Sequence, residues 1–308
     1  MTVIRPATVE DEAEILRLFA LVFQSEMSPE VWRWKYLRDG HVLPAFVAEE
    51  ERQIVCHYGT ICQRVYWQGQ EHYAWDAIDV MAHPRQQGRG LFRRTIQAFM
   101  RELCEGKGLF LYGFPTQRHK RLGELLVGYE PVARVHKVFN VLASPLVGSS
   151  AAVVYDVLPL NWDSHWHRLE KSVVIATRRD HAYLTWRYLK RPNRHYRLVT
   201  IPAAPALAVI GIQSGKALLM EFLIAPDDEV LARQLLAGAE YVAREEGAEV
   251  LEGWMPQFSW ARHFLCRSAK YHEEETEHWL ECRLFDRRLS AAWLAEHFYY
   301  SLGDFDVY

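Results

Sequence analysis

The chain has 308 residues, of which half are hydrophobic and 24% are charged, and its net charge is −3 at neutral pH. This composition is ordinary for a globular protein, and it lacks the basic excess of nucleic-acid-binding proteins. It contains no apolar run of the roughly 18 residues that a membrane helix needs, and the first residues lack the features of a signal peptide. We therefore expect a cytoplasmic protein with room for two domains that binds neither nucleic acid nor membrane.

The cysteines and histidines do not form a metal-binding pattern. The five cysteines are an odd number, and only Cys56 and Cys62 are close in sequence, at a spacing without a metal or redox signature. The histidines at 165, 167 and 181 have no ligand spacing and no accompanying cysteine or carboxylate frame. We expect reduced thiols and no metal.

The first part of the chain alternates between helix and strand patterns. Residues 2–8 predict a strand that ends at Thr8, a helix N-cap with Asp11 in a capping-box position. The helix continues to about Phe23. A second helix starts at Ser28 and Pro29, with serine as cap and proline in the first turn. Strands follow over 45–49, 54–67 and 73–82, and their short connections indicate antiparallel pairing.

The stretch from Ile78 to Phe92 is the most informative part of the sequence. It reads as the end of a strand, a turn broken by Pro84, a loop with Gly88 and Gly90, and the first turn of a helix. The glycines let the backbone approach a ligand closely, and the helix start presents unpaired N–H groups and the positive end of its dipole. Such a loop binds anions, and a diphosphate fits it best. The pattern alone also fits an ordinary turn between a strand and a helix, so the neighbouring elements decide.

The elements after this loop complete a first half. A helix is predicted over 91–105, and the apolar strand 109–114 should lie parallel to the strand before the loop, because a helix crosses between them. A helix over 119–127 and a strand over 132–142 follow. Residues 144–150 have the composition of a linker, so we divide the chain into domains 1–148 and 149–308.

Beyond this linker the sequence repeats itself in the same order. Trp34-Lys35-Tyr36-Leu37 returns as Trp186-Arg187-Tyr188-Leu189, and the block 77–115 returns in 221–257. At the place of the glycines the second copy has Asp227-Asp228-Glu229. These acids favour a helix start and would repel a diphosphate. We expect two copies of one fold, of which only the first binds the anion.

With its strand, Gly-x-Gly loop, helix and parallel strand in this order, the first half resembles the GNAT (GCN5-related) N-acetyltransferases. The residues that carry the resemblance are Arg85-Gln86-Gln87-Gly88-Arg89-Gly90, which match the family pattern Gln/Arg-x-x-Gly-x-Gly/Ala. The whole chain is similar to tandem GNAT proteins with a degenerate second copy. The resemblance implies an α/β (α+β) fold of two GNAT-like domains, each with a mixed, mostly antiparallel sheet flanked by helices.

The resemblance also implies an activity: an acyl-CoA, acetyl-CoA above all, would donate its acyl group to a primary amine that attacks directly in a ternary complex. The amine would be a small molecule or a peptide. Trp32 and Trp34 lie on the helix that relatives use to wall the acceptor site, although tryptophans here also fit a core or a domain interface. A backbone N–H near the end of the strand would polarise the thioester carbonyl. The implied cofactor residues are Ile78, Val80, Met81, Arg85, Gln86, Gln87, Gly88, Arg89, Gly90, Leu91 and Thr116.

The reaction needs a base for the amine proton and an acid for the thiolate. Asp76 and Asp79 lie on the strand that leads into the loop, where strict alternation puts Asp76 on the face of Ile78 and Val80, and a bulge could exchange the two acids. Either could also be a cap or an ion-pair partner. Relatives use a tyrosine as the acid, four residues before a Gly-aromatic pair, where this chain has Glu124.

Glu124 could serve as the acid if burial raised its pKa, or it could be an exposed helix residue. This departure keeps open a second interpretation, a non-catalytic acyl-CoA-binding or scaffold protein. The aromatic tail 298–308 is expected to pack, either across the first half with Asp304 or Asp306 near the substrate or onto its own domain. The sequence leaves open the amine, the acyl chain length and the oligomeric state.

Overall fold

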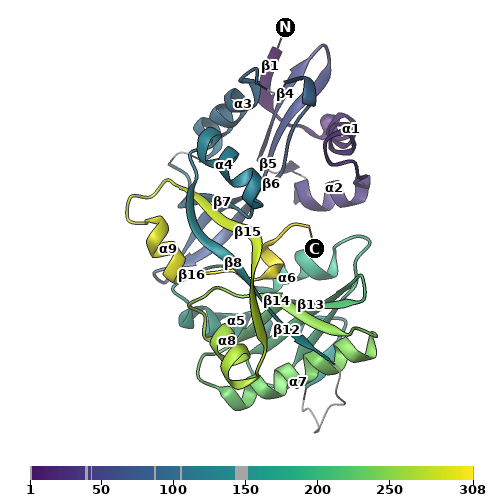
Figure 1. Cartoon of the computed structure of the whole chain (residues 1–308), viewed down its shortest axis with the longest axis vertical. Coiled ribbons are helices and arrows are strands. Elements are labelled where there is room, and N and C mark those ends of the chain that lie inside the picture. The colour runs from purple at the N-terminus through teal and green to yellow at the C-terminus, as the bar shows by residue number, and fades with distance from the viewer. Residues whose placement is uncertain are drawn as a thin grey trace. The chain divides into compact units, whose positions relative to one another are not determined.

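The computed structural model describes residues 2–38, 41–42, 44–86, 88–104, 106–142 and 152–307. They form two compact units that are not the two halves of the sequence (Figure 1). Unit 1 comprises Met1–Arg64, His72–Ala133 and His278–Ala291, and unit 2 comprises Val65–Glu71, Arg134–Glu277 and Ala292–Tyr308. The chain passes from one unit to the other within four strands, β5, β6, β8 and β15, and at the start of α9, whose bounds are given below.

Unit 1 begins as the sequence predicts. Its first elements are β1 (Thr2–Pro6), α1 (Glu12–Phe23), α2 (Pro29–Tyr36), β2 (Leu37–Arg38) and β3 (His41–Val42). The backbone N–H of Thr8 donates to the Asp11 carboxylate at 2.8 Å, and Ser28 Oγ accepts from the Val31 N–H at 3.4 Å. Both predicted caps are therefore confirmed.

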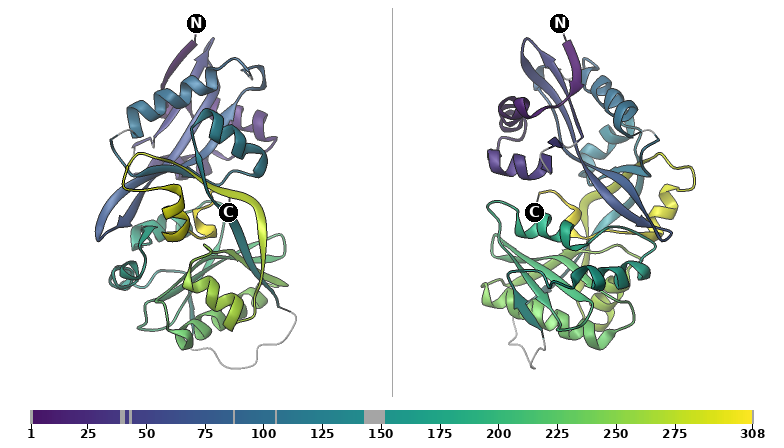
Figure 2. Two further views of the ribbon diagram at one scale, coloured as in Figure 1. Left: turned by 60° about the vertical axis from the view of Figure 1, so that its left-hand side comes forward. Right: turned by 180° about the vertical axis from the view of Figure 1, so that it is seen from behind.

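The sheet of unit 1 has the strand order β1-β4-β5-β6-β7. β1 pairs antiparallel with β4 and β4 with β5, whereas β6 and β7 are parallel, as predicted. Helices α1 and α2 cover one face, and α3 and α4 cover the other (Figures 1 and 2). The bounds are β4 (Ala45–Glu50), β5 (Gln53–Trp67), β6 (Gln70–Ala82), α3 (Leu91–Phe99, continued by a π-helical turn Met100–Cys104), β7 (Phe110–Gly113) and α4 (Gln117–Leu126).

The next strand of this sheet comes from the far end of the chain. β15 (His272–Leu284) pairs antiparallel with β7, with Glu281 opposite Gly113. In exchange, β8 (Glu130–Val141) pairs antiparallel with β14 (Val250–Trp254) in unit 2. The prediction that strand 132–142 completes the first half is wrong, because chain order alone does not decide which sheet a last strand joins. The boundary at residue 148 remains a prediction about where the two repeats meet, and residues 144–150 lie outside the described ranges.

Unit 2 repeats the architecture of unit 1. Its strand order β9-β11-β12-β13-β14 mirrors β1-β4-β5-β6-β7, and β13 and β14 are again parallel. The internal repeat is thus confirmed by the fold. The bounds are β9 (Val153–Tyr155), α5 (Trp162–Leu169), β10 (Ile175–Thr177), α6 (His181–Leu184, continued by a π-helical turn Thr185–Leu189), β11 (Tyr196–Thr200), β12 (Ala206–Gln213), β13 (Lys216–Ile224), α7 (Glu229–Glu245), α8 (Trp260–His263, continued by Phe264–Ser268), α9 (Ala291–His297) and β16 (Phe298–Tyr299).

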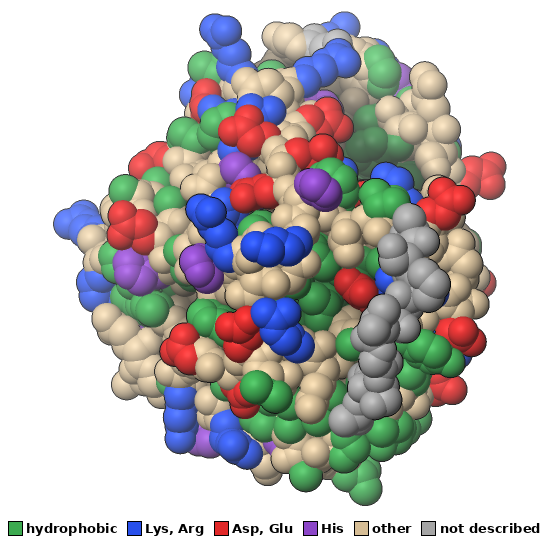
Figure 3. Space-filling model, turned by 60° about the horizontal axis from the view of Figure 1, so that its bottom comes forward, with side chains coloured by type: hydrophobic (Ala, Val, Ile, Leu, Met, Phe, Trp, Pro, Cys, Tyr) green, Lys and Arg blue, Asp and Glu red, His purple; other side chains and the backbone are tan. Residues whose placement is uncertain are grey.

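Each unit has its own hydrophobic core. In unit 1, Phe99 of α3 and Tyr129 pack on Phe46, Tyr58 and Trp75 of the sheet. In unit 2, the apolar side of α7 packs on β11, β12 and β13. Acidic and basic side chains are interspersed on the face shown in Figure 3. In the described ranges, every helix is too short or too polar to cross a bilayer.

Candidate functional site

The two parallel strands of unit 1 separate shortly after they meet. Among the described residues, β6 and β7 pair at Trp75 with Leu111 and at Asp76 with Tyr112. β7 ends one residue later at Gly113, whereas β6 continues to Ala82. We call the point where pairing stops the strand fork. Among the described residues, this register does not extend beyond Asp76 and Tyr112.

The glycine loop, residues 84–90, joins β6 to α3. Gly88 has a φ of +75° and Gly90 a φ of +71°, a region that side chains disfavour. A Cβ added to either glycine would meet no atom within 4 Å, so the space above the loop is open. Gly90 is the N-cap of α3 and has no side chain to cap the helix, and the first turn of α3 contains no acid. The N–H groups that every helix start leaves unpaired are therefore available to an anion.

Some donor groups of the loop already form hydrogen bonds within the protein. The Gln86 amide donates to Glu50 Oε2 at 2.6 Å, and its backbone N–H donates to the carbonyl of His83 at 2.8 Å. The Arg89 N–H donates to the Gln86 carbonyl at 3.2 Å. Gln87 lies outside the described residues. Of the predicted loop donors, Gln86 and Arg89 therefore already have acceptors inside the fold.

Three further residues of the predicted cofactor site, Arg85, Leu91 and Thr116, differ in burial and in hydrogen bonding. The exposed Arg85 donates from Nη2 to Gln53 Oε1 at 3.1 Å. The Leu91 side chain is buried against β4 and β5, which leaves only its backbone N–H for a ligand. Thr116 is the N-cap of α4, and its hydroxyl lies 3.1 Å from Nδ1 of His119.

The end of β6 does not alternate strictly. Asp76 and Ile78 are both buried, but Asp79 has a φ of +46° and interrupts the strand geometry. After it, Val80 is 37% exposed and Met81 is buried. The expectation from strict alternation is therefore wrong beyond Ile78, because a bulge lies at Asp79, which is the alternative that the sequence left open.

A buried polar cluster lies between α2 and the sheet. The Asp79 carboxylate accepts from Lys35 Nζ at 2.9 Å and from the Tyr36 hydroxyl at 2.8 Å. The Asp79 carbonyl oxygen lies 2.8 Å from Nδ1 of His57. Burial lowers the pKa of His57, so its ring is neutral near pH 7, with the proton on Nδ1. Nε2 then carries a lone pair and has no hydrogen-bond partner among the described residues. Sequence reasoning missed His57, because a single histidine in a buried strand carries no pattern.

Both tryptophans of α2 are buried. Trp32 is 1% exposed, and its ring centroid lies 5.6 Å from that of Tyr36. Trp34 is 9% exposed. This burial favours a core role for Trp32, which was one of the two alternatives, and Trp34 is the better candidate for contact with an acceptor.

A second polar group lies on the α3 and α4 side of the fork. The hydroxyls of Tyr58 and Tyr129 are 3.2 Å apart, and burial raises the pKa of Tyr129 well above its ordinary value. Asp76 is buried near them, and its charge also raises the pKa of Tyr129. Glu124, by contrast, forms an ion pair with Lys120 one turn earlier on α4 and is partly exposed. The environment of Glu124 is that of a surface helix residue.

Glu281 joins this group from the end of the chain. It is fully buried on β15, and burial raises its pKa to about 7. Sequence reasoning missed it, because the acidic run His272-Glu-Glu-Glu-Thr-Glu-His278 reads as the end of the second copy and nothing local indicates the strand exchange.

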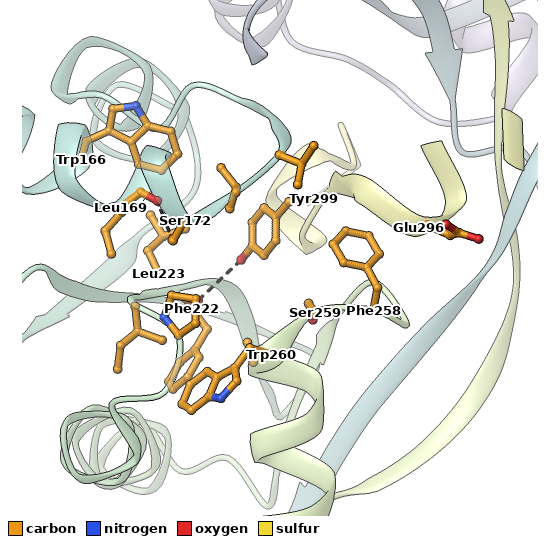
Figure 4. Close-up of a pocket in the computed structure, with 15 residues that line it drawn as sticks. Trp166, Leu169, Ser172, Phe222, Leu223, Phe258, Ser259, Trp260, Glu296 and Tyr299 are labelled. Carbon is orange, nitrogen blue, oxygen red and sulfur yellow. Dashed lines mark hydrogen bonds between the residues drawn. The ribbon is translucent and has the colours of Figure 1, made fainter. Parts of the chain in front are cut away.

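The equivalent place in unit 2 is closed to an anion. The N-cap of α7 is Asp228, whose Oδ1 accepts from the Leu231 N–H at 3.0 Å, and Glu229 lies in the first turn. These acids satisfy the helix start that Gly90 leaves open in unit 1. Unit 2 also has an apolar cavity of about 250 Å³ beyond the end of the β13–β14 pairing, where the Tyr299 hydroxyl donates to the Phe222 carbonyl at 3.5 Å (Figure 4).

The C-terminal tail is docked in unit 2. The buried carboxylate of Asp304 pairs with the guanidinium of Arg179. Arg187 donates to the carbonyls of Gly303 and Phe305, both at 2.9 Å. The tail therefore packs as expected, and Asp304 is bound inside unit 2. Tyr308 lies outside the described residues.

Comparisons with known proteins agree with this geometry. Residues 3–121 match the family described as acetyltransferase (GNAT) domain. A solved structure from Enterococcus faecalis V583, described as a probable N-acyltransferase, superposes with a TM-score of 0.69 and 13% identity over 92% of this chain and 73% of that one. A GCN5-related N-acetyltransferase from Kribbella flavida gives 0.63 and 15%, over 92% and 71%. A tandem GNAT protein from the clavulanic acid biosynthesis pathway gives 0.58 and 13%, over 93% and 99%. A search of curated proteins found no match.

The fork, the glycine loop and the start of α3 all lie in unit 1, in the part of the chain that matches the GNAT domain. Residues 3–121 match a GNAT acetyltransferase domain, and the chain as a whole has a fold similar to that of solved GNAT structures, including a tandem GNAT protein.

Proposed function

We propose that the chain is an acyl-CoA-dependent N-acyltransferase that uses unit 1 to move an acetyl or other acyl group onto a primary amine. The observation that carries the proposal is the glycine loop, with two left-handed glycines, open space above them and an uncapped start of α3. The diphosphate of the acyl-CoA would accept from the N–H groups of Gly88, Gly90 and Leu91. The guanidinium groups of Arg85 and Arg89 would supply positive charge nearby.

The second copy supports this assignment as an internal comparison. It has the same strands and helices, but Asp228 caps α7 and Glu229 follows it. Negative charge at this position repels a diphosphate and stabilises the helix without one. One chain thus carries the same helix start in an open and a closed form, which favours unit 1 as the binding unit.

The thioester would lie at the strand fork. There a backbone N–H of β6 near Ile78–Val80 would polarise its carbonyl, as an oxyanion hole does. The amine attacks the carbonyl carbon and loses a proton, while the thiolate leaves and gains one. We propose Asp76 as the base, because it is buried in the last pair of the fork. Asp79 and Glu124 are bound to Lys35 and Lys120, which favours structural roles for them.

A second candidate is a non-catalytic acyl-CoA-binding or scaffold protein. The observation that favours it is Glu124, which stands where relatives have the acid tyrosine and is bound to Lys120. In either case we expect a cytoplasmic protein with a small or peptidic amine as its acceptor or partner.

One experiment separates these candidates. The full-length protein is mixed with acetyl-CoA and a library of amines, thiol release is followed, and the affinity for CoA is measured by calorimetry. Release that depends on an amine supports the transferase. Binding without release on any amine favours the scaffold. Absence of CoA binding would overturn both.

A further inference from the structure

The bulge near the end of β6 is held by a side chain of the neighbouring strand. The extra residue of a bulge is left out of the ladder of backbone hydrogen bonds, so its carbonyl group needs another donor. At Asp79 this donor is His57 of β5, whose Nδ1 lies 2.8 Å from the Asp79 carbonyl oxygen. A carbonyl oxygen only accepts hydrogen bonds, so Nδ1 carries the proton. His57 therefore bonds the residue that the bulge removes from the ladder.

The surrounding residues leave room for this contact. His57 is fully buried, and its ring packs edge-on against that of Tyr36, with centroids 5.6 Å apart. A Cβ added to Gly59 of β5 would lie 2.6 Å from His57 Cε1 and 3.0 Å from the Ile78 carbonyl oxygen, so glycine leaves the space that the ring and the bulge fill. Burying a polar ring is costly, and Nε2 has no partner among the described residues. The bond from Nδ1 is therefore what favours histidine over an apolar residue here.

The same contact determines the direction of one backbone N–H. The Asp79 carbonyl and the Val80 N–H belong to one peptide group, which is planar and trans, so they point in opposite directions. β6 lies between β5 and β7 in the sheet. Because His57 bonds the carbonyl from β5, the N–H of Val80 is turned away from β5, toward the side where β7 pairs with β6 as far as Asp76. Val80 is 37% exposed, so a ligand can reach this part of β6.

Unit 2 has a bulge at the equivalent place but no histidine beside it. Tyr188 donates to Glu221 as Tyr36 donates to Asp79, and the register of β12 and β13 shifts next to Glu221. The residue opposite Glu221 is Val209, whose side chain has no donor. Asp79 has a left-handed φ of +46°, whereas Glu221 does not. A left-handed residue other than glycine is strained and persists only where its surroundings hold it. The strained bulge and its donor thus occur together, in the unit with the open glycine loop.

We propose that His57 is a positioning residue of the acyl transfer, which holds the Asp79 carbonyl so that the same peptide group presents the Val80 N–H to the thioester oxygen. This inference rests on the proposed function and names the N–H that the reaction uses. As the amine forms the C–N bond, the carbonyl electron pair moves onto the oxygen, and it returns as the C–S bond breaks. A donor that is already in place stabilises this charge without reorganisation. The amine proton passes to the base and the thiolate takes one up, and neither transfer involves His57.

Two amide variants of the full-length protein test where the donor must lie. In histidine Nδ1 is bonded to Cγ, as the amide nitrogen of asparagine is, whereas that of glutamine lies one bond further out. With acetyl-CoA and an amine accepted in the thiol-release assay, His57→Asn should therefore keep kcat close to the wild-type value. His57→Gln, and His57→Val with the residue of unit 2, should lower kcat about 10- to 100-fold, as expected for a misplaced oxyanion donor. The KM for acetyl-CoA should stay constant, because the diphosphate binds at the glycine loop.

The matched control for stability is Ile15→Ala. Ile15 is 2% exposed on α1, a helix of unit 1 that carries none of the groups holding the bulge, and its truncation leaves a cavity that lowers the melting temperature. At temperatures where the variant is folded, its kcat should equal that of the wild type. Equal losses of kcat in His57→Asn and His57→Gln would show that the ring only fills space, and would overturn the inference.

A measurement without turnover separates the inference from the proposed function. Acetyl-CoA with an isotope label at its carbonyl carbon is bound to each variant, and the infrared band of the thioester carbonyl is recorded. A hydrogen bond to the oxygen lowers the frequency of this band, so it should be lower in the wild type and in His57→Asn than in His57→Gln and His57→Val. The same frequency in the wild type and His57→Val would overturn the inference even if acyl transfer is confirmed. Failure of the wild type to bind acetyl-CoA would overturn the proposed function and the inference with it.

Discussion

The hydroxyl of Tyr36 donates to the carboxylate of Asp79 at 2.8 Å, and in the second copy Tyr188 donates to Glu221 at the same distance. The tyrosines belong to the repeated Trp-Lys/Arg-Tyr-Leu segment, and each acid lies on the strand that precedes the loop or its acidic counterpart. Since unit 2 keeps this contact but has no glycine loop, the contact serves the fold of each copy. We therefore regard Asp79 as a structural residue that fixes α2 on the sheet.

Removing the charge of Asp79 should destabilise the protein strongly. Asp79→Asn removes the carboxylate that pairs with the buried Lys35 ammonium group. Breaking a buried ion pair on one side costs roughly 3–5 kcal/mol of the free energy of unfolding. Tyr36→Phe keeps the ion pair and should cost about 1–2 kcal/mol, since it removes one hydrogen bond to a charged group. Urea unfolding followed by tryptophan fluorescence measures both. Equal losses would show that the hydroxyl group, rather than the charge, holds the cluster.

The control for this pair is an ion pair on the surface of the same helices. Arg33 of α2 binds Glu12 of α1 at 2.8 Å, and the Arg33 side chain is 55% exposed. Exposed pairs contribute little, because water screens them. Glu12→Gln should leave the urea midpoint unchanged, and a large shift would mean that any change between α1 and α2 destabilises the protein.

The glycine loop gives a prediction about binding with a control in the other unit. Gly88, Gly90 and Gly215 all have φ values above +70°, and a Cβ added to any of them meets no atom within 4 Å. Valine should therefore strain the backbone similarly at the three positions. Only at the loop would its side chain fill the diphosphate space.

We expect Gly88→Val and Gly90→Val to weaken CoA binding at least about 10-fold, or roughly 1.4 kcal/mol. Gly215→Val should lower the melting temperature similarly and leave the affinity unchanged. Calorimetric titration with CoA and thermal unfolding measure the two effects. Wild-type affinity in both loop variants would place the cofactor elsewhere.

Local signals predicted most of the fold. Thr8 and Ser28 were identified as caps because their bonds involve residues three positions away. The parallel pair β6 and β7 followed from the helix between them. The exchange of β8 and β15 could not be predicted, because both strands have similar patterns and the choice of sheet depends on contacts about 170 residues apart along the chain, such as Glu281 with Gly113.

The contrast between local and long-range signals also applies to the candidate site, whose glycine loop is local and whose buried polar groups are not. The glycine loop is contiguous, so its glycines and the helix after it could be recognised together. The buried polar groups are dispersed: the contact of His57 depends on the bulge carbonyl of Asp79, and the place of Glu281 depends on the strand exchange. The deviation from alternation at Asp79 is a tertiary effect, since its carboxylate is drawn to Lys35 and Tyr36 of α2.

Breaking the contact between Arg179 and Asp304 of the tail should lower the stability of the protein rather than its binding. The Arg179 guanidinium is fully buried, and although burial lowers its pKa, Asp304 and Glu221 raise the pKa well above the ordinary value, so it stays charged. Asp304→Asn removes one of these two counter-charges and should cost roughly 3 kcal/mol of the free energy of unfolding. The exposed Asp156→Asn, which affects a surface pair with Arg197, should cost much less. Urea unfolding measures both, and similar losses would show that the tail contributes no specific stabilisation.

Glu281 should make the stability of the protein depend on pH. Burial raises its pKa to about 7, from an ordinary value of 4.5. Between these values the folded state binds more protons than the unfolded state, so the stabilising effect of the neutral carboxyl group is complete below pH 4.5 and is lost as the pH rises through 7. Because one pKa unit corresponds to about 1.4 kcal/mol, the loss is roughly 3 kcal/mol. The glutamine of Glu281→Gln cannot ionise, so this variant should not lose stability in this way. The difference in the free energy of unfolding between Glu281→Gln and the wild type should therefore grow by that amount between pH 4.5 and pH 8. The control Glu277→Gln should follow the wild type. Urea unfolding across this range measures the difference. A difference that stays constant or shrinks with rising pH would mean that unit 1 accommodates the Glu281 carboxylate without loss of stability.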